Sequence, residues 1–309
     1  MERGCSGVVE ARDLTKRYGN VEAVRGINFS IAPQECFGFL GVNGAGKTST
    51  MKMIYCRTQK TSGKLDVLGM DAQTHPQAIK RRIGVVTQEH ALDPELTVEE
   101  NVLLYASFFG IGGTAARSKC GELLRLMALE GKARSLIREL SGGMKHRLAI
   151  ARGLVNDPEM MVLDEPTTGL DPQARLLMWQ LLLGLRERGI TLILTTHYME
   201  EAARLCDRLV IMDEGKILAE GTPRQLIDRF AAPDVLEVIG VDFENVRVPL
   251  DGLVRRRERH GETTYLYNED NRALLRRLAE AGVDAPQHVA RQATLEDVFL
   301  NLTGRELTE

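Results

Sequence analysis

The apolar run Cys36-Phe-Gly-Phe-Leu40 leads directly into the turn Gly41-Val-Asn-Gly-Ala-Gly-Lys-Thr48, and residues 49–56 then continue without a helix breaker. This order predicts a buried strand, a glycine-rich turn and a helix. The two outer glycines, the lysine and the threonine of the turn occupy every constrained position of the phosphate-binding pattern Gly-x-x-x-x-Gly-Lys-Thr. That pattern is informative only between a strand and a helix, which is the context predicted here.

The predicted turn has the chemistry of a phosphate cradle. Its glycines allow successive backbone N–H groups to converge on phosphate oxygens at the positive end of a helix. Lys47 can reach the outer phosphates of a nucleotide, and the Thr48 hydroxyl can ligate Mg²⁺. The alternative, a glycine-rich turn without a ligand, fits this context poorly. We expect nucleotide contacts from Gly41, Asn43, Gly44, Ala45, Gly46, Lys47, Thr48 and Ser49.

The patterns of apolar residues on both sides of this turn in the sequence indicate an α/β fold. Residues 8–14 and 27–31 alternate between apolar and polar positions, as half-exposed strands do. Further along, strands alternate with helices, which predicts a parallel sheet covered on both faces. The predicted strands are 83–86, 160–163 and 191–195, and the predicted helices are 97–109, 122–129, 142–156, 172–188 and 199–205.

Ala231-Ala-Pro233 predicts a domain boundary. We expect one domain at 1–230, with a helical subdomain at about 91–156, and a small α+β domain at 231–309. In the second domain, the predicted strands are 235–241, 246–248 and 263–267, the predicted helix is 271–281, and a helix cap is predicted at 294–297.

Composition excludes several classes of protein. The 309 residues are 43% hydrophobic and 27% charged, which excludes a disordered or fibrous chain. A net charge of −3 provides no general attraction to nucleic acid or anionic lipid. The five cysteines are far apart and form no Cys-x-x-Cys pair, so we expect reduced thiols and no cysteine-bound metal. The apolar run 176–185 is too short to span a membrane, and the first ten residues lack the apolar core of a signal peptide.

Polar side chains follow three of the predicted parallel strands. Asp164 and Glu165 come after 160–163, Gln88 closes 83–86, and His197 ends the strand that begins at 191. Because the carboxyl ends of parallel strands share one edge of a sheet, we expect these side chains to meet Lys47 in one crevice.

These strand-end residues suggest phosphoryl-transfer chemistry. We expect Asp164 to hold the Mg²⁺ water shell, Glu165 to act as general base on a water, and Gln88 to contact the metal or that water. His197 would contact the γ-phosphate. Taken alone, the two acids could be a solvated turn and His197 a loop histidine, while Gln88 carries almost no signal.

The segment Leu140-Ser-Gly-Gly-Met144 precedes a predicted helix and forms a second glycine-rich helix start. One nucleotide does not need two such cradles on one chain. An ordinary N-cap at Ser141 explains the segment equally well from the sequence alone.

Taken together, these motifs closely resemble those of the ATP-binding subunits of ABC transporters over residues 8–225. The shared segments, in this order, are Gly41–Thr48, Gln88, Leu140–Met144, Met160–Glu165, Gly169–Asp171 and His197. The resemblance implies a P-loop NTPase core of the RecA-like type with an antiparallel β subdomain and a helical insertion. It also implies ATP and Mg²⁺ as ligands.

The same resemblance implies a head-to-tail homodimer that forms on ATP. Ser141, Gly142 and Gly143 would contact the γ-phosphate held by the opposite subunit, and Asp171 would link the two sites. Tyr18 lies where an aromatic ring stacks on adenine in that family, although a strand-edge aromatic is an equally good reading of this residue. The signature segment usually ends in glutamine, whereas Met144 stands here and removes one amide side chain.

The ending Thr294-Leu-Glu-Asp-Val-Phe-Leu-Asn-Leu-Thr-Gly304 resembles the tail of exporter ATPases whose permease is a separate chain. The segments 195–202 and 204–208 are similar to those of nodulation-factor export and drug-resistance ATPases. These similarities imply a cytoplasmic ATPase that lies on the inner face of the cell membrane against integral-membrane permease subunits.

Two other classes of nucleotide-binding protein would carry features that this sequence lacks. A non-transport cassette ATPase with a nucleic-acid or ribosomal partner typically carries a long coiled coil or a second cassette, and neither is present here. A GTP-binding switch would need a base-reading Asn-Lys-x-Asp motif, which the sequence lacks. We expect no nucleic-acid partner.

Overall fold

The computed structural model describes residues 7–89, 91–241, 243, 250, 252–283, 285 and 287–304. The chain divides into two compact units, Met1–Glu220 and Gly221–Glu309. Helix α8 (Pro223–Phe230) contacts α10 (Leu295–Thr303) within the second unit. The observed division therefore precedes α8, whereas the sequence pattern placed the boundary after residue 230.

A six-stranded sheet with the order β10-β9-β3-β8-β7-β6 forms the centre of the first unit. The pairs β3–β8, β3–β9, β7–β8 and β6–β7 are parallel, as predicted. Every residue of β7 and β8 is buried, because continuous apolar runs suit strands that are covered on both faces. The bounds are β3 (Cys36–Leu40), β6 (Ile83–Val86), β7 (Met160–Asp164), β8 (Thr191–Thr196), β9 (Arg208–Asp213) and β10 (Lys216–Gly221).

A second sheet of the first unit has the order β2-β1-β4-β5, and its printed pairings are antiparallel. Its strands are β1 (Val9–Tyr18), β2 (Val21–Ile31), β4 (Ser62–Val67) and β5 (Met70–Asp71). Its apolar side chains share one core with helix α1 (Lys47–Ile54) and with β3. The antiparallel β subdomain and the α/β core are thus confirmed.

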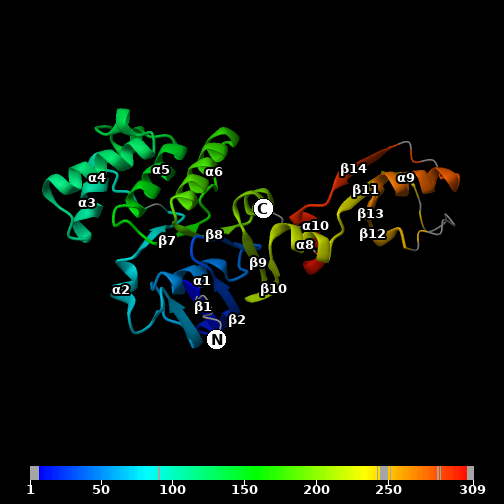
Figure 1. Ribbon diagram of the computed structural model, residues 1–309, viewed down its shortest axis with the longest axis horizontal. Helices are drawn as coiled ribbons and strands as arrows, with labels where there is room; N and C mark the ends of the chain where they lie inside the picture. Colours follow the sequence, from blue (N-terminus) through cyan, green and yellow to red (C-terminus); the bar gives the residue numbers. More distant parts are fainter. Residues whose placement is uncertain are drawn as a thin grey trace. The chain divides into compact units, whose positions relative to one another are not determined.

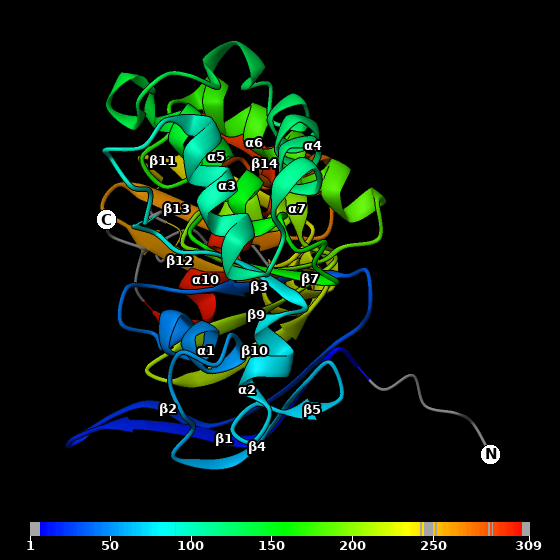
Figure 2. The ribbon, with the colours of Figure 1, turned by 90° about the vertical axis from the view of Figure 1, so that its left-hand side faces the viewer.

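Helices α3 (Val98–Phe108), α4 (Gly113–Leu126) and α5 (Gly142–Gly153) lie on the side of the six-stranded sheet opposite to β1 and β2 (Figures 1 and 2). The predicted capping box is present, with the Thr97 and Glu100 side chains bonded to each other's backbone N–H groups. Helix α4 starts earlier than predicted, although two glycines mark its start. The remaining helices of the unit are α2 (Pro76–Lys80), α6 (Pro172–Glu187), α7 (Met199–Leu205) and the short turns Glu130–Lys132 and Ile137–Glu139.

The second unit is a small α+β fold, as expected. Its sheet has the order β12-β13-β11-β14, and helix α9 (Asn271–Glu280) packs on it through Leu274 and Leu278. The strands are β11 (Asp234–Ile239), β12 (Val254–His260), β13 (Thr263–Asn268) and β14 (His288–Gln292). The predicted strand at 246–248 lies outside the described residues. Among the helices that are described, none is long and apolar enough to cross a membrane.

Candidate active site

The glycine-rich turn between β3 and α1 is held against neighbouring backbone. A Cβ atom on Gly41 would lie 2.3 Å from the carbonyl oxygen of Met212, and one on Gly46 would lie 2.5 Å from that of Ala23. Gly46 also has a φ of 101°, which strains other residues. Helix α1 has no side-chain N-cap and no acidic residue in its first turn. No acidic residue of the helix itself therefore competes with an anion for its positive end.

Lys47 is buried at the start of α1, with only 4% of its surface exposed. Its Nζ donates to the carbonyl oxygens of Gly41 at 2.7 Å and Val42 at 3.1 Å. Burial lowers the pKa of Lys47, and the nearby carboxylates of Glu165 and Asp164 oppose that shift. A buried ammonium group with neutral oxygen partners is well suited to phosphate oxygens, so this position fits a nucleotide.

Asp164, at the end of β7, accepts hydrogen bonds from two hydroxyl groups. Thr195 Oγ1 donates to Asp164 Oδ1 at 2.6 Å, and Thr48 Oγ1 donates to the same oxygen at 3.3 Å. A carboxylate beside a hydroxyl matches the oxygen ligands that Mg²⁺ prefers. In the described part of the chain, no group of three or more His, Cys, Asp or Glu side chains could hold a metal by itself. An ion bound here would therefore need phosphate and water ligands as well.

The carboxylate of Glu165 contacts three other polar side chains. Its Oε1 lies 3.5 Å from His197 Nδ1, and its Oε2 accepts from Thr168 Oγ1 at 3.2 Å and from Gln88 Nε2 at 3.4 Å. Interaction with His197 is the main cause that holds the pKa of the Glu165 carboxyl below its usual value, and burial opposes it. The carboxyl is thus ionised at neutral pH and able to accept a proton.

The backbone of Glu165 is strained. Its φ is 51°, in the left-handed region, and its N–H donates to Thr195 Oγ1 at 3.0 Å. Such conformations persist where surrounding contacts enforce them, often at functional sites. The contacts from Thr195 and Thr168 were not predicted, because a lone hydroxyl near a strand end has no distinctive spacing.

The structure brings together the predicted strand-end residues and the lysine and threonine of the glycine-rich turn. We call this group the Lys47 cluster, and its members are Lys47, Thr48, Gln88, Asp164, Glu165 and His197. They come from the carboxyl ends of β6, β7 and β8 and from the turn after β3, as the parallel topology requires.

Other predicted residues do not join this cluster. Ser141 caps α5, accepting from Met144 N at 3.3 Å, and Asp171 caps α6, accepting from Ala174 N at 2.8 Å. Tyr18 is exposed at the end of β1, with the Lys16 ammonium 4.7 Å from its ring centre. Ser141 is thus the N-cap of α5, and Gly142 and Gly143 lie in the first turn of that helix.

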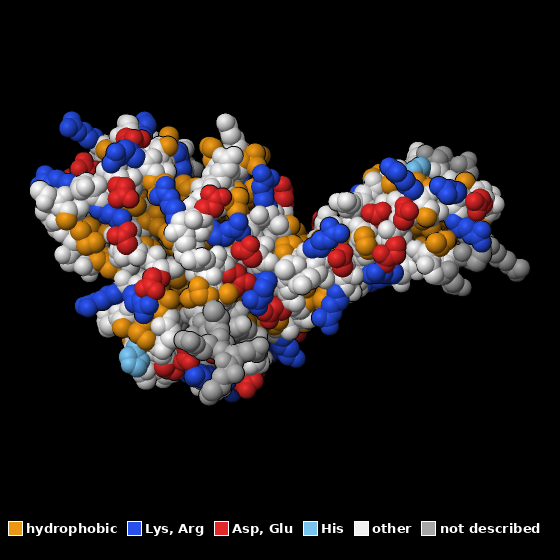
Figure 3. All heavy atoms as spheres, in the orientation of Figure 1, with side chains coloured by type: hydrophobic (Ala, Val, Ile, Leu, Met, Phe, Trp, Pro, Cys, Tyr) orange, Lys and Arg blue, Asp and Glu red, His pale blue; other side chains and the backbone are white. Residues whose placement is uncertain are grey.

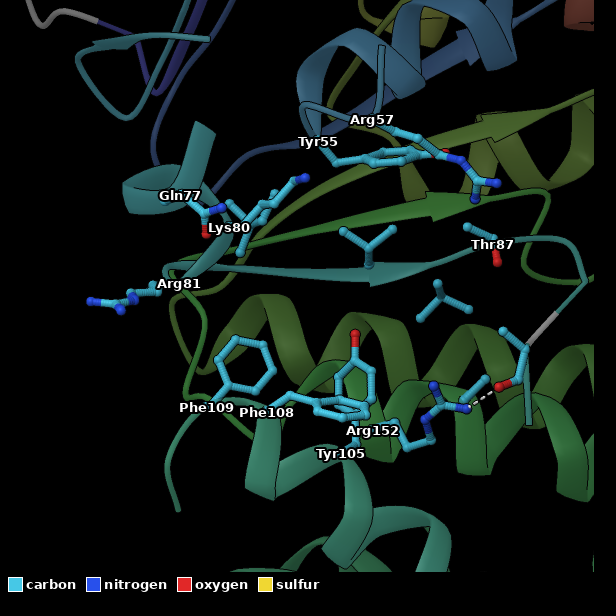
Figure 4. A pocket seen from close by; sticks show the side chains of 15 residues that line it. Tyr55, Arg57, Gln77, Lys80, Arg81, Thr87, Tyr105, Phe108, Phe109 and Arg152 are labelled. Atoms are coloured by element: carbon cyan, nitrogen blue, oxygen red, sulfur yellow. Dashed lines mark hydrogen bonds between the residues drawn. The ribbon is translucent and has the colours of Figure 1, made fainter. Parts of the chain in front are cut away.

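A separate cavity of about 540 Å³ lies between the sheet and α3. The rings of Tyr105, Phe108 and Phe109 face Tyr55 across it, and Lys80 and Gln77 lie along one end (Figure 4). Thr87, next to Gln88 of the Lys47 cluster, also lines it. The cavity is therefore connected to the polar site by one short segment of chain.

Two family models match this chain. One is described as ABC transporter and matches residues 24–168, and the other is the C-terminal domain of the nodulation factor export protein NodI and matches 244–304. Among solved structures, a dimeric ATP-binding cassette with ADP and Pi bound in a post-hydrolysis state is 30% identical, with a TM-score of 0.64 over 69% of this chain and 98% of that one. The protein cbiO1 of Clostridium perfringens, described as part of the ABC transporter complex cbiONQ, is 27% identical, with a TM-score of 0.67 over 72% of this chain and 92% of that one.

Relatives that align over nearly their whole length are also ATP-binding proteins of transporters. The Nod factor export ATP-binding protein I of Burkholderia orbicola is 46% identical over 97% of this chain and 98% of its own length. The protein of the same name from Rhizobium etli is 44% identical over 99% of this chain and 96% of its own. The chain therefore belongs to the family of ABC transporter ATPases that includes the Nod factor export ATP-binding proteins.

Proposed function

We propose that this ATPase binds and hydrolyses ATP at the Lys47 cluster as one half of a dimer, and that closing and reopening of the dimer drive a separate export permease. The observation that carries the proposal is the placement of Glu165 beside Lys47, His197 and Gln88 at one edge of the sheet. An ionised carboxylate at that position can accept the proton of a water that attacks the terminal phosphate.

The residues of the cluster divide the reaction between them. Lys47 and the N–H groups of the glycine-rich turn hold the phosphates, which places the terminal phosphate in front of Glu165. Thr48 and Asp164 would hold Mg²⁺, which when bound neutralises charge on the phosphate oxygens. Glu165 takes the proton from water, while His197 and Gln88 keep its carboxylate in place. As the bond from water to the γ-phosphorus forms, the bond to the bridging β–γ oxygen breaks and ADP leaves, and Lys47 stabilises the charge that develops on the phosphate oxygens.

The second glycine-rich helix start supports dimerisation. Ser141 is the N-cap of α5, and Gly142 and Gly143 are its first residues, where N–H donors favour an anion. Within the described residues, no hydrogen bond joins these three residues to the Lys47 cluster of their own chain. A nucleotide held by a second copy supplies that anion. The solved relative described above is itself a dimer with ADP and Pi bound. Asp171 would then link the two sites, and Tyr18 would stack on adenine.

We assign the cavity next to Thr87 to the permease. Phe108 is 71% exposed and Leu104 is 43% exposed on the same helix, α3, which is unusual for a surface without a partner. Figure 3 shows hydrophobic side chains gathered in this part of the first unit. Since Thr87 precedes Gln88, a permease segment in this cavity could sense the active site. The ATPase would thus lie against the inner face of the membrane.

The surface does not favour a nucleic-acid partner. Lys and Arg side chains are interspersed with Asp and Glu over the face seen in Figure 3, and no single basic patch dominates it. Export rather than import is supported by the names of the relatives, and the cargo would be selected by the permease.

A substitution on α3 tests the coupling to a permease. Phe108→Asp should leave ATP hydrolysis by the purified chain unchanged and should abolish its recovery with permease-containing membranes. Val21→Asp is the matched control, because Val21 is 67% exposed at the start of β2, away from the cavity. Equal membrane recovery of both variants would contradict the assignment of this surface.

A further inference from the structure

Glu201, in the first turn of α7, is completely buried although it is a glutamate, and it is outside the Lys47 cluster. Its Oε1 accepts from Thr167 Oγ1 at 2.7 Å and from Trp179 Nε1 at 3.2 Å. Its Oε2 has no hydrogen-bond partner among the described residues. Burying a carboxyl with one oxygen unsatisfied is unfavourable, so the buried position of Glu201 requires an explanation.

The two donors come from separate parts of the chain. Thr167 lies in the turn after β7, two residues beyond Glu165, and Trp179 lies in the middle of α6. Burial raises the pKa of Glu201, and interactions with the side chains of Thr196, Thr167 and Trp179 oppose that shift. The carboxyl therefore joins the turn after β7, helix α6 and helix α7 at one buried point.

These bonds close a ring that includes the active site. Thr168, beside Thr167, donates to Glu165 Oε2, so the same turn is bonded to both carboxyl groups. Glu201 follows His197 by four residues, and His197 Nδ1 lies 3.5 Å from Glu165 Oε1. The ring thus runs from Glu165 through Thr167 to Glu201, along the chain to His197, and back to Glu165. The N–H of Glu165 is also bonded to Thr195, two residues before His197, so the bond between Thr167 and Glu201 provides a second link between the turn and the His197 segment. Losing this second link would loosen the turn relative to the His197 segment.

We infer that Glu201 is a positioning residue for ATP hydrolysis: by holding Thr167 against α6 and α7, it keeps Glu165 and His197 in contact. The inference rests on the proposed role of Glu165 in hydrolysis. Glu201 does not belong to the phosphate-binding turn, so its effect should fall on the chemical step and not on nucleotide affinity.

The first test compares Glu201→Ala with Glu201→Gln in steady-state ATP hydrolysis. Glutamine keeps a carbonyl oxygen that can accept from Thr167 and Trp179, whereas alanine removes both bonds. We expect Glu201→Ala to lower kcat about 10-fold or more, because small displacements of reacting groups are costly, with KM for ATP changed less than about 2-fold. Glu201→Gln should stay within about 3-fold of the parent kcat. Rates are normalised to the ATP-binding stoichiometry measured by calorimetry, which removes any loss of folded protein.

Two further variants separate positioning from simple packing. Leu182→Ala removes a fully buried side chain of α6 without breaking a polar bond. It should lower thermal stability but leave the normalised kcat nearly unchanged. Thr167→Val removes one donor, and combining it with Glu201→Ala should cost no more in kcat than Glu201→Ala alone. If Glu201→Ala does not fold, Thr167→Val alone tests whether the bond between Thr167 and Glu201 supports catalysis.

The results are interpreted against Glu165→Gln. If Glu165→Gln is inactive while Glu201→Ala and Thr167→Val keep the parent kcat, the positioning role is wrong and the proposed function stands. Equal normalised losses in Leu182→Ala and Glu201→Ala would also overturn it. If Glu165→Gln itself hydrolyses ATP at the parent rate, the proposed function fails instead.

Discussion

Replacing Glu165 by glutamine removes one negative charge from the centre of the site and changes the size of the side chain very little. The parent carboxyl has only 10% of its side-chain surface exposed and is in contact with His197. Its lowered pKa means that it is ionised at neutral pH and can take a proton from water. The glutamine carbonyl can still accept from the Thr168 hydroxyl, but an amide cannot act as a general base. The local structure should therefore persist while proton transfer is lost.

The expected size of the effect follows from that single loss. General-base catalysis contributes about 100- to 10,000-fold, which equals about 3 to 5 kcal/mol of barrier. We expect turnover of Glu165→Gln to fall about 100-fold or more. ATP affinity should be retained or increased, because Lys47 remains and one negative charge near the phosphates is removed.

The assay measures phosphate release at saturating ATP and Mg²⁺, with binding measured separately by calorimetry. Glu200→Gln, on the exposed side of α7, changes the net charge by the same amount and should behave as the parent. Parent-like turnover in Glu165→Gln, or an equal loss in Glu200→Gln, would refute the assignment of Glu165 as the base.

Three further outcomes are expected. Lys47→Ala should weaken ATP binding in calorimetry, because the buried phosphates lose their nearest cation, and unchanged affinity would count against the phosphate site. Ser141→Arg should abolish the ATP-dependent dimer in light scattering while ATP still binds the monomer, and a persistent dimer would oppose a shared site. Asp297→Asn should lower the free energy of unfolding by about 2 kcal/mol in urea, because Asp297 accepts two bonds from Arg291. Burial would raise the pKa of Asp297, but Arg291 and Thr294 hold it below its usual value, so the difference should be full above about pH 4 and vanish as the pH falls further. A difference that is absent at neutral pH, or that grows in acid, would contradict this account of Asp297.

The core of the fold could be predicted because its signals are local. The continuous apolar run before Gly41 and those at 160–163 and 191–195 could be read as buried strands, and parallel topology then placed Gln88 and His197 beside Glu165. Charged strands gave no such signal. β12 reads Val254-Arg-Arg-Arg-Glu-Arg-His260, and β14 is mostly exposed, so their pairing depends on β13 and β11.

The missed features depend on tertiary contacts. Thr195 and Thr168 act through hydroxyl groups that only the folded chain brings to Asp164 and Glu165. A glutamate in a short helix is normally exposed, so nothing in the sequence marks Glu201 as buried. The cavity beside Thr87 is lined by segments that lie far apart along the chain, and no periodicity connects them.

The central claim is that each nucleotide is held by two copies of the chain, and mixing two inactive variants tests it most directly. Lys47→Ala and Ser141→Arg each disable both sites of their own homodimer. In a mixed pair, the intact Lys47 of one protomer meets the intact Ser141 of the other, and the arginine faces the half-site that holds no nucleotide. We predict that ATP hydrolysis appears when the two purified variants are combined. If the mixture remains as inactive as its components, although both variants are folded, the shared site is wrong.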